Sequence, residues 1–195
     1  LEDWTRVRGL MTTLLDLVEA FEAEYTRSKR ELGGVDFSDL EQLSLRLLVD
    51  PEGRPTPAAL GCRRRFDHVF VDEVQDINGA QDAILLAVSR DGDAGNRFLV
   101  GDVKQSIYRF RLANPGIFRA YEKSWRSDPS LGRVIPLTDN FRSREGLLAM
   151  INGLFEHLMT AGLGGVEYAD GAQLRFGNRE GRSELATRPG GAVPV

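Results

Sequence analysis

Two short apolar stretches separated by a helical segment constrain the fold of this chain most strongly. His68–Asp72 and Phe98–Gly101 are dominated by apolar residues, as in strands that are buried on both faces. Between them, Ile84, Leu85 and Val88 have the spacing of one helix face. A strand, a helix and a second strand in this order form a βαβ unit with parallel strands. The sequence therefore predicts an α/β fold whose parallel sheet is flanked by helices.

Helical patterns precede this unit. A long leading amphipathic helix, which should end near Gly33–Gly34, is predicted from apolar residues at three- and four-residue steps: Trp4, Val7, Met11, Leu14, Val18, Phe21 and Tyr25. Ser38 and Glu41 have the spacing of a capping box, which would open a helix through about Leu48. Thr56-Pro57 predicts a further short helix with proline at its first position.

Other elements are expected after the βαβ unit. Asn114-Pro115 should cap a helix that runs to about Trp125, and Arg133–Leu137 is a candidate third strand. A last helix is predicted from apolar spacing at Leu147, Ile151, Leu154, Phe155 and Leu158. Residues 162–195 are rich in glycine and polar residues and have little periodicity, which favours a linker or the start of a further insertion.

Composition excludes several classes of protein. The formal net charge of −4 argues against a surface coated with positive charge for nucleic acid, although a local DNA-binding groove stays compatible with it. Cys62 is the only cysteine, so no intrachain disulfide can form, and we expect a cytoplasmic protein. His68 and His157 are isolated and are expected to be structural. No run of about 18 apolar residues occurs, so no membrane span is expected.

The first block of residues that could carry chemistry follows the first predicted strand. Asp72 and Glu73 are adjacent carboxylates at the carboxyl end of that strand, where ligands bind in open α/β sheets. This is the pattern of a Walker B element, in which one carboxylate holds Mg²⁺ through water and the next orients the attacking water. The alternative is a solvated acidic loop, and this block by itself does not decide between the two.

The second block, Gly101–Arg111, follows the second predicted strand and should lie beside the first. Gln105 can donate a hydrogen bond to a phosphate oxygen. Tyr108, Phe110 and Arg111 mix aromatic rings with a guanidinium group, a combination that suits single-stranded nucleic acid. The alternative is an aromatic turn in the core with arginines that extend to solvent.

The third block, Leu137–Ser143, follows the third candidate strand. Arg142 could reach a γ-phosphate as an arginine finger. The alternative is that Ser143 or Asn140 caps a helix and that Arg142 lies on the surface.

In this order and spacing, the three blocks resemble motifs II, III and IV of UvrD/Rep-like superfamily 1 DNA helicases. Val35–Leu40 resembles the Asp-Phe-x-Asp-Leu element that precedes motif II in that family. Gly101–Phe118 is most similar to AddA/RecB-type helicase–nuclease subunits, because plain UvrD or Rep proteins usually carry glycine where Leu112 stands. The resemblance implies a partial P-loop NTPase (RecA-like) fold and a motor that hydrolyses ATP to move on single-stranded DNA, in an enzyme of double-strand break repair.

The resemblance also implies roles in nucleotide chemistry. Asp72 would hold the Mg²⁺ of bound ATP through water. Glu73 would be the second carboxylate at the metal. Glu73 would be the catalytic base or would position the attacking water. Gln105 and Arg142 would both contact the γ-phosphate and so count as catalytic and nucleotide-binding residues.

Further implied roles concern coupling and DNA. Gln75 and Asp76 would couple the nucleotide site to its neighbours, and Tyr108, Phe110 and Arg111 would contact single-stranded DNA. The implied partners are single-stranded DNA, DNA ends and a second subunit of AddB type, with no membrane.

The chain departs from the family pattern mildly at Val74, where many members carry an aromatic residue, and more strongly by an absence. No Gly-x-x-x-x-Gly-Lys-[Ser/Thr] occurs, and none of Lys29, Lys104 and Lys123 follows such a phosphate-binding loop. Since the chain also opens on Leu1, we expect a cut end within a longer protein. Our hypothesis is that the chain alone does not hydrolyse ATP or unwind DNA. An incomplete sheet should also leave apolar surface uncovered, which predicts self-association or marginal stability.

The resemblance implies four segments. Residues 1–66 would be a helical segment that ends a helical insertion, 67–132 the later part of the first motor domain, 133–161 the start of the second, and 162–195 a linker or further insertion. Two rival functions remain open: a helicase-like scaffold that binds DNA without turnover, and a plain UvrD/Rep helicase without a nuclease. Intact Asp72-Glu73, Gln105 and Arg142 count against the scaffold.

Overall fold

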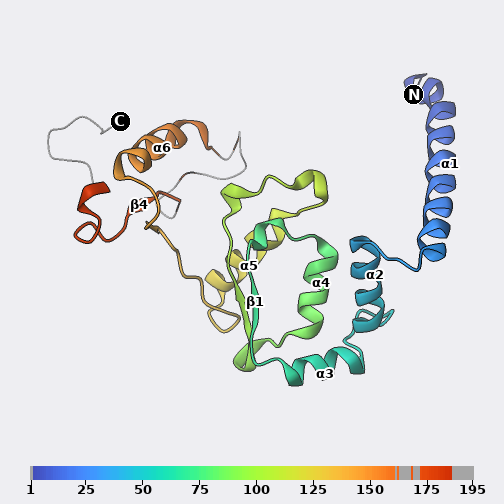
Figure 1. The fold of residues 1–195 in the computed structure, drawn as a ribbon, viewed down its shortest axis with the longest axis horizontal. Helices are drawn as coiled ribbons and strands as arrows, with labels where there is room; N and C mark the ends of the chain where they lie inside the picture. The colour runs from blue at the N-terminus through green and yellow to red at the C-terminus, as the bar shows by residue number, and fades with distance from the viewer. Residues whose placement is uncertain (1, 161, 163–167, 169–171, 186–195) are drawn as a thin grey trace. The chain divides into compact units, whose positions relative to one another are not determined.

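The structure is a computed structural model that describes residues 2–160, 162, 168 and 172–185 (Figure 1). The chain forms two compact units. The first comprises Leu1–Asp67 and Ala80–Ser89, and the second comprises His68–Gly79 and Arg90–Val195. No helix among the described residues is long and apolar enough to cross a membrane.

The first unit is helical. It contains α1 (Glu2–Glu31), α2 (Phe37–Leu48), α3 (Pro57–Arg65) and most of α4 (Gly79–Val88). Leu48, Ala59 and Ala87 form its buried core, so α2, α3 and α4 each contribute one residue. Arg63 Nε donates to the carbonyl oxygen of Ala87 at 2.8 Å, which satisfies one of the free carbonyls at the end of α4.

The predicted leading helix is confirmed as α1, and its end has the expected chemistry. Gly33 takes a left-handed φ of 63°, and its N–H donates to the Arg30 carbonyl. Gly34 N–H donates to the Lys29 carbonyl at 3.0 Å, which completes a Schellman motif. The apolar stripe of α1 is exposed within the described part of the chain; Phe21, for example, is 68% exposed.

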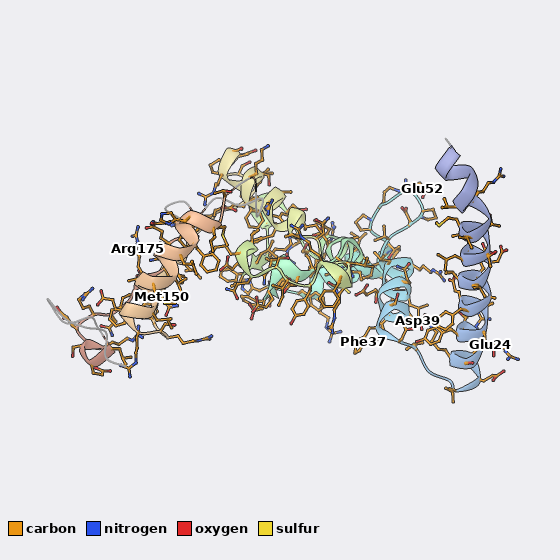
Figure 2. The ribbon with its side chains drawn as sticks, turned by 90° about the horizontal axis from the view of Figure 1, so that it is seen from above. Glu24, Phe37, Asp39, Glu52, Met150 and Arg175 are labelled. Atoms are coloured by element: carbon orange, nitrogen blue, oxygen red, sulfur yellow. The ribbon has the colours of Figure 1, made fainter. Side chains whose placement is uncertain are left out.

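The start of α2 differs from the prediction. The N-cap is Asp36, whose side chain accepts from Asp39 N–H at 2.8 Å, and the Asp39 carboxylate accepts from Asp36 N–H at 3.0 Å. The predicted Ser38–Glu41 capping box is therefore wrong by two residues. Aspartate suits the N-cap as well as serine does, and the earlier start also places Asp39 beside α1 (Figure 2).

The second unit carries the predicted parallel sheet. β1 (Val69–Val71) pairs with β2 (Arg97–Leu99) in parallel, with Phe70 opposite Phe98. The α/β class and the strand–helix–strand order are thus confirmed. The expectation that both faces are buried is wrong for the described residues, because Phe70 is 73% exposed and Phe98 54% exposed. Their ring centroids lie 5.8 Å apart, so one face of the sheet is an exposed aromatic pair.

Helix α5 (Pro115–Ser127) begins as predicted, with Asn114 as N-cap and proline at the first position. It packs against the start of β2 through a mostly buried arginine. Arg97 donates to the Tyr121 hydroxyl at 3.1 Å, forms an ion pair with Asp91 and stacks over the Tyr121 ring. This contact fixes α5 against the sheet.

The predicted strand at Arg133–Leu137 is absent. No strand among the described residues pairs with this segment, and Ile135 and Leu137 are 57% and 80% exposed, so neither hydrogen bonds nor burial favour extended pairing there. A two-residue strand β3 (Asp139–Asn140) follows instead and pairs in parallel with β4 (Arg175–Phe176). The sequence did not predict β4, because its segment has little periodicity.

The last predicted helix is confirmed as α6 (Glu145–Leu158), and β4 packs beside it (Figure 2). Asn152 on α6 joins the two elements. Its Nδ2 donates to the Leu174 carbonyl at 2.9 Å, and its Oδ1 accepts from Leu174 N–H at 3.0 Å.

Candidate functional site

The predicted carboxylates lie at one end of the parallel sheet. Asp72 and Glu73 directly follow β1, and Asp102 follows the neighbouring strand after Val100 and Gly101. Val100 N–H donates to the Val71 carbonyl at 2.8 Å, and Val74 N–H donates to the Val100 carbonyl at 3.0 Å. Backbone pairing thus continues past the strands and holds the two chain segments together where the acidic side chains emerge.

Glu73 has a strained backbone. Its φ of 50° and ψ of 40° lie in the left-handed region, which costs a non-glycine residue about 1–2 kcal/mol. Two hydrogen bonds hold it there: Glu73 N–H donates to Asp72 Oδ1 at 2.9 Å, and Glu73 Oε2 accepts from Gln75 Nε2 at 2.7 Å. Strain that is fixed by surrounding contacts is typical of functional sites.

Gln75 is the buried centre of this arrangement. Its side chain is almost fully enclosed, at 1% exposure. Its Oε1 accepts from Asp102 N–H at 2.9 Å, while its Nε2 donates to Glu73 and, at 3.4 Å, to Asp76 Oδ2. One amide group therefore connects the carboxylate after β1 with the backbone after β2.

Gly101 makes room for this contact. A Cβ atom at this position would lie 2.6 Å from Gln75 Oε1 and 2.7 Å from Val74 Cγ1, closer than such atoms approach. The close passage of the two segments therefore depends on a residue without a side chain.

Asp102 organises the segment that contains Gln105. Lys104 Nζ donates to Asp102 Oδ1 at 2.8 Å, and Gln105 Nε2 donates to Asp102 Oδ2 at 3.0 Å. Burial favours the neutral carboxyl, but the hydrogen bonds from Lys104 and Gln105 outweigh it and lower the pKa of Asp102 below its usual value. Asp102 is therefore an ionised anchor for the Gln105 amide.

The strand-end residues fit a magnesium nucleotide. Asp72 and Glu73 are exposed carboxylates, and among the described residues neither forms an ion pair. Asp76 Oδ1 is buried without a hydrogen-bond partner. No group of three or more His, Cys, Asp or Glu side chains in the described ranges could form a metal cage. Mg²⁺ does not need such a cage, because it binds through one or two carboxylates, water and phosphate oxygens.

Asp72, Glu73 and Gln105 line the same groove, whose cavity volume is about 1220 Å³. The groove also borders the segment from Leu131 to Asn140. Its volume is enough for a nucleotide.

Tyr108, Phe110 and Arg111 form an exposed cluster. The two ring centroids lie 6.0 Å apart, and the Arg111 guanidinium lies 5.5 Å from the Tyr108 centroid and 5.7 Å from that of Phe110. Phe110 is 77% exposed. The alternative of an aromatic turn in the core is therefore wrong for the described residues, and the rings are available for stacking.

Leu112 ends this segment in a left-handed conformation, with φ of 66°. Left-handed backbone favours glycine, the residue that the resemblance implied for plain UvrD or Rep proteins at this position. Leu112 thus stands where the backbone itself prefers glycine.

The predicted third block forms a turn after β3 that the Asn140 side chain closes. Asn140 Oδ1 accepts from Arg142 N–H at 2.9 Å and from Ser143 N–H at 2.8 Å. The Arg142 side chain is exposed and makes no ion pair with any residue in the described part of the chain. The alternative of a helix cap at Asn140 or Ser143 is wrong, because the N-cap of α6 is Arg144 and no side chain caps it. Its second part, an Arg142 side chain on the surface, is confirmed, and an exposed guanidinium is compatible with an arginine finger.

The structure therefore brings most, but not all, of the predicted site together. Hydrogen bonds join Glu73, Gln75 and Asp76, and Gln75 links them to the Asp102 backbone. Arg142 is not among the residues that line the groove. Sequence reasoning missed Asp102, although its place directly after a strand and a glycine was a usable signal.

Comparisons with known proteins agree with these features. Residues 9–126 match the family model of the UvrD/REP helicase N-terminal domain. The chain is 43% identical over 183 residues to an ATP-dependent helicase/nuclease subunit of Bacillus cytotoxicus, a match that covers 91% of this chain and 15% of that protein. It is 45% identical over 194 residues to the corresponding subunit of Moorella thermoacetica, covering 95% of this chain and 13% of the relative.

A third relative, the same subunit of Anoxybacillus flavithermus, is 45% identical over 179 residues, or 89% of this chain. The chain spans only about one seventh of the length of these relatives, since 13–15% of each is covered. The similarity to helicase–nuclease subunits predicted from Gly101–Phe118 is confirmed. With the parallel sheet, its paired carboxylates and the family match over residues 9–126, this chain belongs to the UvrD/Rep helicase family.

Proposed function

We propose that this chain is part of an ATP-dependent DNA helicase of helicase–nuclease type, which couples ATP hydrolysis to movement on single-stranded DNA during double-strand break repair. The observation that carries the proposal is the buried Gln75 amide, which joins Glu73 to the segment of Asp102 and Gln105. A purely structural acidic loop needs no such link between two strand ends.

In this proposal, Asp72 and Glu73 would hold Mg²⁺, which when bound would supply positive charge against the transferring phosphate. Glu73 accepts the proton of the attacking water or orients it, and its exposed carboxylate is held in place by Gln75. Gln105 donates to the γ-phosphate through the Nε2 hydrogen that Asp102 does not take, and Arg142 contributes a positive charge to the same phosphate.

Coupling and DNA binding use the neighbouring segment. Gln75 and Asp76 transmit the state of the nucleotide site to the segment of Gln105, because the Gln75 amide contacts Glu73 and Asp76 after β1 and the Asp102 backbone after β2. Tyr108 and Phe110 stack on bases and Arg111 meets phosphate, as their exposure and mutual packing allow. DNA ends, a partner subunit of AddB type and a cytoplasmic location complete the proposal.

The chain lacks a phosphate-binding loop, and we propose that residues 1–195 alone neither hydrolyse ATP nor unwind DNA. The exposed Phe70 and Phe98 favour self-association of the isolated chain. The first motor domain would end near 132 and the second would begin at 133. Measurable DNA-stimulated ATP turnover by the purified chain would contradict the proposal that residues 1–195 alone do not hydrolyse ATP.

The decisive test is DNA-stimulated ATP hydrolysis by the complete protein, wild type beside Glu73→Gln. We expect the variant to bind ATP while kcat falls about 10²–10⁴-fold, as for loss of a general base. Glu180→Gln, an exposed glutamate outside the site, should leave kcat unchanged. If the wild type shows no turnover with Mg²⁺ and single-stranded DNA, the chain belongs to a non-catalytic scaffold.

A further inference from the structure

Arg182 lies in the glycine-rich segment that the sequence suggested to be a linker, yet it contacts the turn that carries Arg142. Its Nη1 donates to the Asn140 carbonyl at 2.8 Å and to the Gly177 carbonyl at 3.3 Å. Its Nη2 donates to the Ser143 carbonyl at 2.8 Å. One guanidinium group therefore binds the backbone on both sides of Arg142.

Other contacts fix Arg182 in turn. Its guanidinium lies 4.5 Å from the centroid of the Phe176 ring, a cation–π contact on β4. β4 itself is paired with β3, since Arg175 N–H donates to the Thr138 carbonyl at 2.9 Å. The side chain of Arg182 is partly buried, which strengthens its hydrogen bonds relative to those in open solvent.

The backbone N–H groups of the turn and its carbonyl groups are hydrogen-bonded by two different side chains. Asn140 Oδ1 accepts the N–H groups of Arg142 and Ser143, and Arg182 donates to the carbonyls of Asn140 and Ser143. The backbone around Arg142 is thus held by both its donors and its acceptors, while the Arg142 side chain is left free. A flexible turn would have to be ordered each time its arginine met a phosphate.

We propose that Arg182 is a positioning residue that holds the Asn140–Ser143 turn in the conformation in which Arg142 meets the γ-phosphate. The inference rests on the proposed function of Arg142 and deepens it. Arginine suits this role better than lysine, because its planar fork donates several hydrogen bonds in fixed directions. Arg182 would not touch the nucleotide and would act only through Arg142.

The test is a double-mutant cycle on DNA-stimulated ATP hydrolysis by the complete protein. We expect Arg142→Ala to lower kcat about 10³-fold or more. Arg182→Gln should lower kcat about 10–100-fold, the range seen for misplaced catalytic groups, with little change in the KM for ATP. Because Arg182 acts through Arg142, adding Arg182→Gln to Arg142→Ala should lower kcat less than about threefold further.

Two further variants separate positioning from folding. Arg182→Lys keeps the charge but loses the fork, and it should lose less kcat than Arg182→Gln while it melts at the wild-type temperature. Arg179→Gln is the matched control: Arg179 lies on the same segment and pairs with Glu145, but donates to no carbonyl of the turn. Its kcat should stay within about twofold of wild type.

Two results would overturn the inference while leaving the proposed function intact. The first is an unchanged kcat in both Arg182 variants. The second is a double mutant whose fold loss in kcat equals the product of the losses of Arg142→Ala and Arg182→Gln. If Arg142→Ala alone leaves kcat unchanged, the proposed role of Arg142 fails, and the inference fails with it. A raised KM for ATP with unchanged kcat would place Arg182 in nucleotide binding and would also overturn it.

Discussion

Two pairs of acidic residues in this chain have opposite surroundings. At the joint of α1 and α2, Lys29 Nζ contacts Asp36 Oδ2 at 3.0 Å and Asp39 Oδ2 at 2.6 Å. At the end of β1, Asp72 and Glu73 are exposed and form no ion pair with the described residues. The first pair shares one ammonium group within the protein, whereas the second pair has no such partner among the described residues. Similar residue types thus serve structure in one place and are available for chemistry in the other.

Among the changes that test this comparison, the exchange of one acid in each pair should have the largest effect. In the complete protein, Asp72→Asn should lower DNA-stimulated ATP turnover about 10–100-fold at fixed Mg²⁺, as for residues that act on a metal through water. Asp39→Asn should leave turnover within about twofold, because Lys29 still holds Asp36. A steady-state assay over a range of Mg²⁺ concentrations measures both. Equal losses in the two variants would break the comparison.

A second change tests whether the available acids depend on the packing of Gln75. Gly101→Ala would press a methyl group against Gln75 Oε1 and Val74, so we expect a loss of about 1–3 kcal/mol in the free energy of unfolding and a lower kcat. Chemical denaturation gives the stability. Gly61→Ala is the control, since Gly61 lies in α3 and no atom lies within 4 Å of the added Cβ. Alanine is favoured over glycine in a helix, so this variant should gain about 0.5–1 kcal/mol in the free energy of unfolding. A stable, fully active Gly101→Ala variant would show that the contact is dispensable.

A third change tests whether the left-handed backbone at Glu73 differs from that at Leu112. Glu73 and Leu112 both have left-handed φ angles, but only Glu73 is held by side-chain hydrogen bonds. Leu112 is 79% exposed, so its replacement by glycine removes strain and little apolar contact. Leu112→Gly should stabilise the protein by about 0.5–1 kcal/mol in thermal or chemical unfolding. A destabilised variant would mean that the leucine side chain has a contact of its own.

The smallest effect concerns the two acids that pair with Lys29. The pKa of Asp36 is lowered from 3.8 to about 2, first by the hydrogen bond from Asp39 N–H and then by that from Lys29. Because the folded-state value is lowered, ionised Asp36 favours the joint at neutral pH, and this contribution is lost as the pH falls from about 4 to about 2. Lys29→Gln should raise the pKa of Asp36 part of the way towards 3.8, as measured by NMR titration of the carboxyl group. The pKa of Asp128, lowered by Ser130, should not move.

Local signals explain what could be predicted. The apolar stretches at β1 and β2, the prolines at the starts of α3 and α5, and the glycines after α1 act on neighbouring residues, so the sequence predicts these elements directly. Residues 133–137 mislead because their apolar pattern resembles a strand, while pairing depends on a neighbour far along the chain. β4 escapes prediction for the converse reason: two residues pair with β3 across 36 positions in the chain, from 139 to 175.

The same division holds for the candidate site. Asp72, Glu73, Gln105 and Arg142 stand in motifs with fixed order and spacing, and the sequence by itself determined the family and nominated these residues. Only the tertiary structure decided which groups surround them, because hydrogen bonds such as Gln75 to Asp102, 27 positions apart, and Arg182 to Asn140, 42 positions apart, join segments that the sequence keeps separate. Folding brings such partners together through burial and backbone pairing, and no pattern local to either segment records the contact.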